Sequence, residues 1–424
     1  MAKLHRYPVS STRSNDIVCR NIAAAQAKRV MMRTVEHCDG RRLELDGRPL
    51  LSFGSCSYLG LERRAELRAA TVAAIDRYGT QFPFSRAYLQ CALYEELEAN
   101  LEQMTGRAVV VAPSTTLAHM AALPVLVRDN DAALLDQFAH ASLHAATELL
   151  VNVPVRLVRH NRLDQVDRWV TELSPRHERI WLIIDGIYSM FGDIAPFDGL
   201  ADLLRRHPQL HLYIDDAHAT GWCGTTGRGA ALTHFEGHER VIVALSLNKA
   251  FSAAGGALAL PDSHCKSMIR RCGGPMLFSG PIQPPMLGAA VASSRLHLGA
   301  DHAALQRELA DRIDYTLLAA RKVGLPLATD CRTPIFFIAS DSIDDATDAV
   351  RELMARGVYV CPAAFPAVPV NRPGVRFTIT LHNERQDIDT LIAAAAELIG
   401  RRFSRRRETE GSVQERALED QTAG

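Results

Sequence analysis

Apolar and polar residues follow two different periods along the chain, and these periods predict its elements. Between about residues 62 and 290, stretches of helical periodicity such as 62–77 and 88–104 are separated by short continuous apolar runs. A short apolar run bounded by polar turns is typical of a strand buried on both faces of a parallel sheet. The seven runs are 108–112, 133–136, 155–158, 181–185, 212–215, 241–246 and 257–260. The pattern therefore predicts an α/β fold with a mainly parallel seven-stranded sheet flanked by helices.

A second, smaller α/β segment follows this region. Its predicted elements are helix 303–322, strand 335–339, helix 343–356, strands 358–361 and 375–380, and helix 385–400. Before the sheet, the pattern predicts a helix over 15–36 and a strand and turn over 43–51. We therefore expect four parts: an N-terminal helix and strand arm (1–61), a large domain (62–290), a small C-terminal domain (291–400) and a disordered Arg-rich tail (401–424).

Charge and cysteine content narrow the functional class. The 48 Lys and Arg residues balance 48 Asp and Glu residues, so the chain lacks the positive field expected of a nucleic-acid binder. Nine scattered cysteines without a C-x-x-C pair favour a reducing compartment, and no signal peptide is evident, so we expect a cytoplasmic protein. The longest uncharged run, 273–294, contains four prolines and four glycines and predicts a buried loop leading into a helix, not a membrane span. No metal site is predicted.

Chemically active residues follow several of the predicted strands. Ligands of open α/β sheets bind at the carboxyl ends of the strands, and there Asp215 ends one apolar run while Lys249 follows the next. Taken singly, Lys249 reads as a surface residue and Asp215 as a helix cap. Together they are what a pyridoxal 5′-phosphate (PLP) enzyme needs: a lysine for a Schiff base, and a carboxylate that keeps the pyridine nitrogen protonated.

The remaining requirements of PLP also have candidates. His218 lies three residues after Asp215 and is suited to contact the phenolic oxygen, and His140 is suited to stack on the ring. The turn that begins a helix after the first apolar run is suited to bind a phosphate, because free N–H groups and hydroxyls favour an anion. The hydroxyls at this end are Ser114, Thr115, Thr116 and Ser246. The glycines at 221, 224 and 227 do not fit the dinucleotide fingerprint and are interpreted as loop geometry.

These residues and their spacing resemble the α-oxoamine synthases, PLP enzymes of the fold-type I aminotransferase class. The family includes serine palmitoyltransferase, 8-amino-7-oxononanoate synthase, 5-aminolevulinate synthase and quorum-signal aminoketone synthases. The resemblance extends from about residue 50 to 399. Its most specific pieces are D-D-A-H-A-T-G (215–221), S-L-N-K-A-F (246–251), D-G-I-Y-S-M-F-G-D-I-A-P (185–196), H-A-S (140–142), F-S-G-P-I-Q-P-P (278–285), and P-A-V-P (366–369) followed by V-R-F-T-I-T-L-H (375–382).

The resemblance implies a role for each matching residue. Lys249 attaches the cofactor, Asp215 pairs with the pyridine nitrogen and His140 stacks on the ring. His218 and Ser189 lie near the phenolic oxygen, while Ser114, Thr115 and Ser246 contact the phosphate. Ser279 and Gly280 reach the phosphate of a partner subunit, which implies a homodimer with shared active sites. Arg376 holds the carboxylate of an amino acid, and the substrate side also includes Cys56, Tyr58 and Arg86.

The resemblance implies a decarboxylative condensation of an amino acid with an acyl thioester, carried by coenzyme A or by a carrier protein, to an α-amino ketone. The chain departs from the family around the substrates: Cys56 replaces the usual Asn, Phe84-Ser85-Arg86 replaces G-S-R, and the phosphate turn carries Thr115 and His119 where Gly and Asn are usual. Three alternatives stay open: a PLP-dependent aminotransferase, a non-catalytic partner subunit on the same fold, and an unrelated α/β binding protein.

Overall fold

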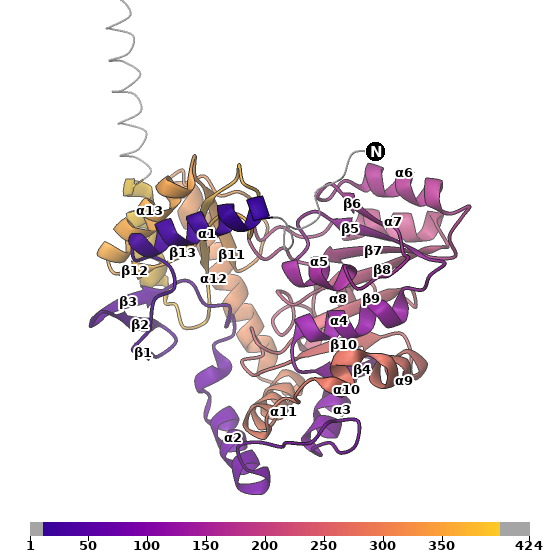
Figure 1. Cartoon of the computed structure of the whole chain (residues 1–424). Coiled ribbons are helices and arrows are strands. Elements are labelled where there is room, and N and C mark those ends of the chain that lie inside the picture. Colours follow the sequence, from indigo (N-terminus) through magenta and orange to yellow (C-terminus); the bar gives the residue numbers. More distant parts are fainter. Residues whose placement is uncertain (1–11, 399–424) are drawn as a thin grey trace, which may run out of the picture.

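A seven-stranded sheet forms the centre of the larger part of the molecule (Figure 1). We describe residues 12–398 of the chain from a computed structural model. The strands are β4 (Ala108–Ala112), β5 (Ala132–Asp136), β6 (Val155–Val158), β7 (Ile180–Asp185), β8 (Leu210–Asp215), β9 (Val241–Ser246) and β10 (Gly256–Leu260). Their order is β4-β10-β9-β8-β7-β5-β6, and only β10 runs antiparallel to its neighbours. The predicted fold class and all seven predicted strands are confirmed.

Both faces of this sheet are buried because successive strand residues point to opposite sides. Val109 and Val111 belong to one core cluster, and Val110 and Ala112 belong to another. The first core is closed by α3 (Leu93–Thr105), α6 (Leu163–Leu173), α7 (Phe197–Arg206), α8 (Ala230–His234) and α11 (Pro284–Leu298). The second is closed by α4 (Thr115–Leu126), α5 (Ala141–Thr147), α9 (Ser263–Cys272) and α10 (Gly274–Phe278). Burial on both faces explains why these strands are continuous apolar runs.

The smaller part combines the two ends of the described chain. One sheet joins β1 (His37–Cys38), β2 (Arg42–Leu45) and β3 (Arg48–Ser52) to β12 (Val358–Tyr359), and a second has the order β11 (Ile335–Ala339), β14 (Gly374–Thr378), β13 (Cys361–Ala363). Helices α1 (Thr12–Ala27), α12 (His302–Lys322) and α13 (Ile343–Ala355) and a helix over residues 385–398 complete it. In Figure 1 these elements gather on the left, with α12 between them and the large sheet.

Three predicted elements differ in extent from the structure. The first helix ends at Ala27 and not at 36, because Arg29 and Met32 adopt left-handed backbone angles (φ 57° and 51°). The predicted strand 358–361 is divided, because the chain passes at Val360 from a parallel pairing with β3 to an antiparallel pairing with β14. Helix α3 begins at Leu93 and not at 88. The residues before it form a turn in which the Ser85 hydroxyl accepts the N–H of Ala87.

The uncharged run 273–294 forms α10, a short non-helical connection and the start of α11. Within residues 12–398, no helix combines the length and apolar character that a membrane crossing requires. Helix α2 (Ala65–Tyr78), which follows the short 3₁₀ turn Leu61–Arg63, packs against α11 and begins close to its predicted start. The predicted Arg-rich tail lies outside the described residues.

Candidate active site

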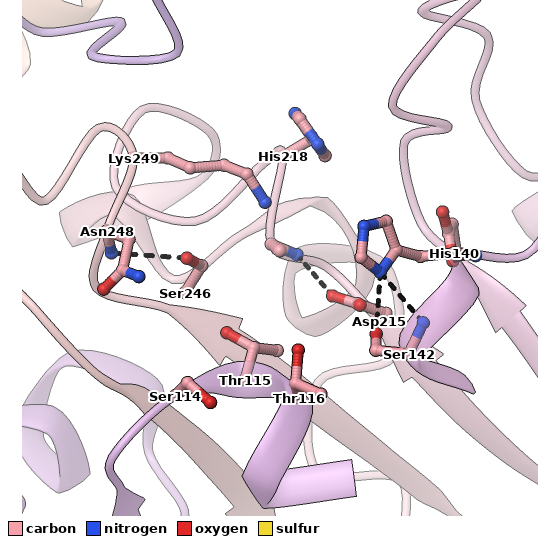
Figure 2. Close-up of a pocket in the computed structure, with 12 residues that line it drawn as sticks. Ser114, Thr115, Thr116, His140, Ser142, Asp215, His218, Ser246, Asn248 and Lys249 are labelled. Atoms are coloured by element: carbon pink, nitrogen blue, oxygen red, sulfur yellow. Dashed lines mark hydrogen bonds between the residues drawn. The ribbon is translucent and has the colours of Figure 1, made fainter. Parts of the chain in front are cut away.

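A cavity of about 160 Å³ lies at the carboxyl edge of the large sheet. Figure 2 shows its polar lining, with Lys249 and His218 at one side, His140 across from them and three hydroxyls below. The lining residues are Ser114, Thr115, Thr116, His140, Ser142, Asp185, Asp215, Ala217, His218, Ser246, Asn248 and Lys249. Eight of the residues predicted for the site are therefore brought together from four separate segments of the chain.

Asp215 lies at the end of β8 with its carboxylate almost fully buried. Its Oδ1 accepts the backbone N–H of Ala217 at 3.0 Å, and its Oδ2 lies 2.9 Å from His119 Nε2. Burial on its own would raise the pKa of Asp215, but His119 and then Lys249 outweigh burial and hold this pKa well below its usual range. The cavity therefore contains a buried carboxylate that stays ionised.

Lys249 follows β9 and directs its ammonium group into the cavity (Figure 2). Across residues 12–398, no acceptor lies within hydrogen-bonding distance of its Nζ. The adjacent Asn248 shapes the turn, since its Oδ1 accepts the N–H of Gly255 at 2.7 Å. The Lys249 side chain is partly exposed, so its amine is accessible to a ligand that enters the cavity. Lys249 therefore has the environment of a group that reacts with a ligand.

His140 is the N-cap residue of α5 and lines the opposite side of the cavity. Its backbone N–H donates to Asp185 Oδ1 at 3.0 Å, and its Nδ1 lies 2.7 Å from Ser142 Oγ. Ser142 also donates its backbone N–H to the same Nδ1 at 3.3 Å. Burial lowers the pKa of His140, so the ring is neutral at physiological pH. The ring is thereby held as a flat, uncharged wall.

His218 is fixed by a residue that the sequence predicted only for the substrate side. Tyr58 Oη lies 2.7 Å from His218 Nδ1, and both side chains are buried. Burial, and then the positive charges of Lys249 and Arg376, lower the pKa of His218 well below its usual value. Burial also raises the pKa of Tyr58, so the hydroxyl stays protonated and donates a hydrogen bond to Nδ1. His218 therefore presents Nε2–H as a donor.

The first turn of α4 forms the hydroxyl-rich end of the cavity. Ser114 Oγ caps the helix by accepting the N–H of Leu117 at 3.2 Å, and Thr115 Oγ1 donates to the carbonyl of Leu245 at 3.2 Å. Strand β10 passes so close that a Cβ on Gly256 would lie 2.4 Å from the N atom of Thr115. Only glycine permits this approach, which leaves backbone N–H groups of the helix start available to an anion.

Arg376 and its neighbours form a second cluster beside the cavity. Arg376 lies on β14, its Nε donates to the carbonyl of Ser189 at 2.8 Å, and its Nη2 approaches Cys56 Sγ at 3.6 Å. Burial on its own would raise the pKa of Cys56, but Arg376 and Lys249 outweigh it, and the pKa lies below the usual value. Ser189 thus contributes its carbonyl here, and its hydroxyl does not line the cavity.

Three predicted site residues lie apart from the cavity. Arg86 is buried, donates to the carbonyl of Val111 at 2.6 Å, and lies with its guanidinium 3.6 Å from the ring centroid of Tyr94. Ser279 and Gly280 lie in the partly exposed connection between α10 and α11. Their predicted contact is with a second subunit, so a single chain does not test it.

Sequence reasoning gave no role to four residues that shape the site: His119, Ser142, Asp185 and Asn248. Ser142 and Asp185 belong to motifs that the sequence had singled out, and Asn248 precedes the lysine. The signal for His119 was its position one helical turn after Thr115, on the buried face of α4. That spacing alone does not reveal that it meets Asp215, because the contact joins residues 96 positions apart.

The arrangement fits PLP on its own features. Five groups surround one cavity: a buried ionised carboxylate, an amine without a hydrogen-bond partner among residues 12–398, a neutral imidazole ring, an imidazole N–H donor and the first turn of a helix. These are the groups that the pyridine nitrogen, aldehyde, ring face, phenolic oxygen and phosphate of PLP each require. Asp215, Lys249, His140, His218 and the α4 turn would hold those parts in that order.

Comparisons with known proteins agree with this chemistry. The aminotransferase class I and II family matches residues 48–394. The chain is 32% identical over 381 residues to a putative 8-amino-7-oxononanoate synthase of Desulfovibrio desulfuricans, covering 88% of this chain and 96% of that protein. It is 28% identical over 373 residues to the 8-amino-7-oxononanoate synthase of Thermoanaerobacter pseudethanolicus, covering 87% and 92%.

Solved structures share the fold. Serine palmitoyltransferase from S. paucimobilis with a bound PLP–myriocin aldimine superposes with a TM-score of 0.84 at 20% identity, covering 91% of this chain and 97% of that one. The Sphingomonas wittichii serine palmitoyltransferase gives a TM-score of 0.82 at 21% identity, covering 92% and 98%.

Proposed function

The chain belongs to the α-oxoamine synthase family of PLP-dependent enzymes, and we propose on that basis that it condenses an amino acid with an acyl thioester, releasing carbon dioxide and a thiol and forming an α-amino ketone. One observation carries the proposal: Lys249 Nζ, which has no hydrogen-bond partner among residues 12–398, shares a cavity with the buried carboxylate of Asp215, whose pKa is lowered. PLP supplies an electron sink for the carbanion formed at the amino acid Cα.

The residues of the chain divide the remaining work. Lys249 Nζ takes the Cα proton, since it is the basic group that faces the middle of the cavity. Asp215 keeps its negative charge next to the cofactor nitrogen, and His218 Nε2–H donates to the cofactor's phenolic oxygen. His140 covers one face of the site and limits the entry of water. The charge of Asp215 and the proton positions of His140 and His218 are already fixed by neighbouring residues.

Arg376 is the proposed ligand of the amino acid's carboxylate. A guanidinium carries five N–H donors, and the contacts with Ser189 and Cys56 use two of them. The remaining donors suit the planar, bidentate geometry of a carboxylate. Holding this group fixes which Cα bond lies closest to Lys249.

The bonds of the condensation balance as follows. A C–C bond forms between the amino acid Cα and the acyl carbon, and the C–S bond of the thioester breaks, so that the sulfur leaves as a thiolate, which takes a proton from the solvent to become the free thiol. The C–C bond to the carboxylate then breaks to release carbon dioxide, and a proton from Lys249 Nζ restores the Cα–H bond. We propose coenzyme A as the thiol, with a carrier protein as the other source of the same thioester.

We also propose that the enzyme acts as a homodimer in the cytoplasm. Phe278, at the end of α10, and Tyr88 are 88% and 87% exposed, and the two segments that carry them are joined by a hydrogen bond from Ser85 Oγ to the carbonyl of Leu277. This apolar surface adjoins Ser279 and Gly280 and supports a subunit contact there. Nine free cysteines support a reducing compartment. Sedimentation of the purified chain tests the dimer.

The test is a substrate screen of the PLP-loaded chain. Pairs of small amino acids and acyl-CoA esters of increasing length are supplied, and carbon dioxide, free thiol and the α-amino ketone are measured together. We expect equal amounts of the three products, all lost in Lys249→Ala and retained in Lys322→Ala, a lysine-to-alanine control at an exposed position. Formation of a keto acid without thiol release would instead identify an aminotransferase. Absence of any turnover in a chain that binds PLP would favour the non-catalytic subunit.

A further inference from the structure

His119 connects the buried acid of the site to a second strand residue. The side chain projects from α4 and has no exposed surface. Its Nε2 lies 2.9 Å from Asp215 Oδ2, and its Nδ1 lies 2.9 Å from the hydroxyl of Tyr213. Tyr213 and Asp215 are two residues apart on β8 and therefore project from the same face of the strand. One imidazole thus spans both side chains.

The three groups together define where the protons lie. An ionised carboxylate has no proton to give, so the hydrogen between His119 and Asp215 belongs to His119 Nε2. Tyr213 is fully buried, which raises the pKa of its hydroxyl well above the usual value and keeps it protonated. Over residues 12–398 its only hydrogen-bond partner is His119 Nδ1. A hydroxyl that donates to Nδ1 leaves that nitrogen without a proton and places the hydrogen of the imidazole on Nε2.

Each carboxylate oxygen of Asp215 accepts one hydrogen bond from the protein. Oδ1 accepts from the N–H of Ala217 and Oδ2 accepts from His119, so both oxygens are held from the protein side. A carboxylate offers about four lone-pair positions, and the remaining ones face the cavity that Asp215 lines. An imidazole that donates through Nε2–H and accepts at Nδ1 orients the carboxylate without cancelling the negative charge that a pyridine nitrogen needs.

We propose that His119 is a positioning residue for the cofactor, locked by Tyr213 as the neutral Nε2–H tautomer and holding the Asp215 carboxylate toward the pyridine nitrogen of PLP. The hydrogen bonds from Tyr213 through His119 to Asp215 join helix α4 to strand β8. The inference rests on the binding of PLP, and it does not depend on the identity of either substrate.

The test compares two variants of nearly equal size. His119→Gln keeps an N–H donor close to the position of Nε2, whereas His119→Met fills similar space without a donor. We measure the PLP dissociation constant of each full-length chain by fluorescence titration, and thermal melting shows that both fold. Loss of a hydrogen bond to a buried charged group predicts a rise of roughly tenfold or more for the Met variant. The Gln variant should stay within about threefold of the wild type.

A spectroscopic measurement reads the tautomer directly. In the ¹⁵N spectrum of histidine-labelled, PLP-loaded protein, the resonances lost in His119→Gln should include one unprotonated Nδ1 and one protonated Nε2. Tyr213→Phe, which removes only the hydroxyl, should shift that Nδ1 resonance and leave Nε2 protonated. This variant also keeps the proposal testable should His119→Met fail to fold.

Three results would overturn the inference. The first is an equal loss of PLP affinity in the Gln and Met variants, which would show a packing role only. The second is wild-type affinity in both, and the third is a protonated Nδ1 in the wild type. A wild-type chain that binds no PLP would overturn both this inference and the proposed function, whereas wild-type binding with unresponsive variants would overturn the inference alone.

Discussion

The two ends of the active site are built in different ways. At the cofactor end, Asp185 and Asp215 are direct neighbours on adjacent strands of one sheet, and Lys249 follows the next strand. At the substrate end, Arg376, Cys56 and the carbonyl of Ser189 come from three segments that only the assembled molecule brings together. Strand register sets the geometry of the cofactor end. The geometry of the substrate end depends on how the smaller part of the molecule packs against the large sheet.

The difference separates chemistry from specificity. Cys56, which we predict on the substrate side, contacts Arg376 through its thiol and forms no hydrogen bond with Asp215 in the described part of the chain. Substitutions in the loops can therefore change the substrate specificity of such a fold while the residues that hold the cofactor stay the same. The predictions below test this separation.

The largest effect is expected at the cofactor end. Asp215→Asn removes the negative charge but keeps the size of the side chain, so the pyridine nitrogen loses the group that keeps it protonated. We expect turnover to fall by roughly a thousandfold with any substrate pair, in line with loss of an essential electrostatic contact. Steady-state assays of carbon dioxide release measure it.

Asp262→Asn is the matched control, because Asp262 caps α9 by accepting the N–H of Cys265 and Asn caps equally well. It should retain wild-type turnover. A mild effect of Asp215→Asn, within threefold of this control, would contradict the electrostatic role of Asp215.

The second effect separates the two ends kinetically. Arg376→Lys keeps the charge but loses the planar fork, so the KM for the amino acid should rise roughly 10- to 100-fold, corresponding to about 1.5–3 kcal/mol. The dissociation constant for PLP should stay unchanged, since Arg376 does not line the cofactor cavity. Arg332→Lys, at an exposed ion pair with Asp314, is the control. A larger loss of PLP affinity than of amino acid affinity would show that the two ends are not separable.

The sequence predicts residues that strand register brings together better than contacts between distant segments. Strand runs and the residues after them gave Asp215, His218 and Lys249, because the carboxyl ends of neighbouring strands meet at one edge. The hydrogen bonds of His119 to Asp215 and of Tyr58 to His218 were not predicted. They join residues 96 and 160 positions apart, and no local period encodes such a distance. The division of 358–361 was missed for the same reason, because it depends on pairing with β3 and β14. The end of α1 was missed because Arg29 and Met32 adopt left-handed backbone angles that residues other than glycine rarely adopt.

A smaller effect is expected at Cys56. Its pKa is lowered because Arg376 and Lys249 together outweigh burial, so the thiolate fraction at pH 7.5 should exceed that of an ordinary cysteine. Alkylation by iodoacetamide should therefore begin at lower pH for Cys56 than for the exposed Cys272, and a bound amino acid should slow it. Mass spectrometry of digested protein follows each site.

Cys56→Ser provides the control for this reactivity and should change the KM for the amino acid only about threefold, as expected for a weak thiol contact. Alkylation of Cys56 that is no faster than that of Cys272 at any pH would contradict the proposed influence of Arg376. Unchanged alkylation with saturating amino acid would place the substrate elsewhere.

The smallest effect on turnover is expected at His160, which connects the two ends. Its Nδ1 lies 3.2 Å from Asp136 at the end of β5, and its Nε2 lies 2.6 Å from Asp193 in the loop that also carries Ser189. Burial opposes its charge, but the hydrogen bonds to Asp136 and Asp193 raise the pKa of His160 to about 9. Because this folded-state pKa exceeds the unfolded value of about 6.5, the stabilisation is fully present below pH 6.5 and is lost as the pH rises through about 9.

His160→Gln should therefore lower the free energy of unfolding by about 2–3 kcal/mol at pH 6 and by progressively less toward pH 10, while turnover changes little. Denaturant titrations across this pH range measure the difference. His234→Gln is the matched control, since His234 lies 3.7 Å from a fully exposed Asp198 and a surface pair contributes little. A pH-independent difference between wild type and His160→Gln would mean that His160 acts by packing against Phe138 and not through its charge. A loss of turnover as large as that of Asp215→Asn would mean that the loop, and not strand register alone, sets the cofactor end.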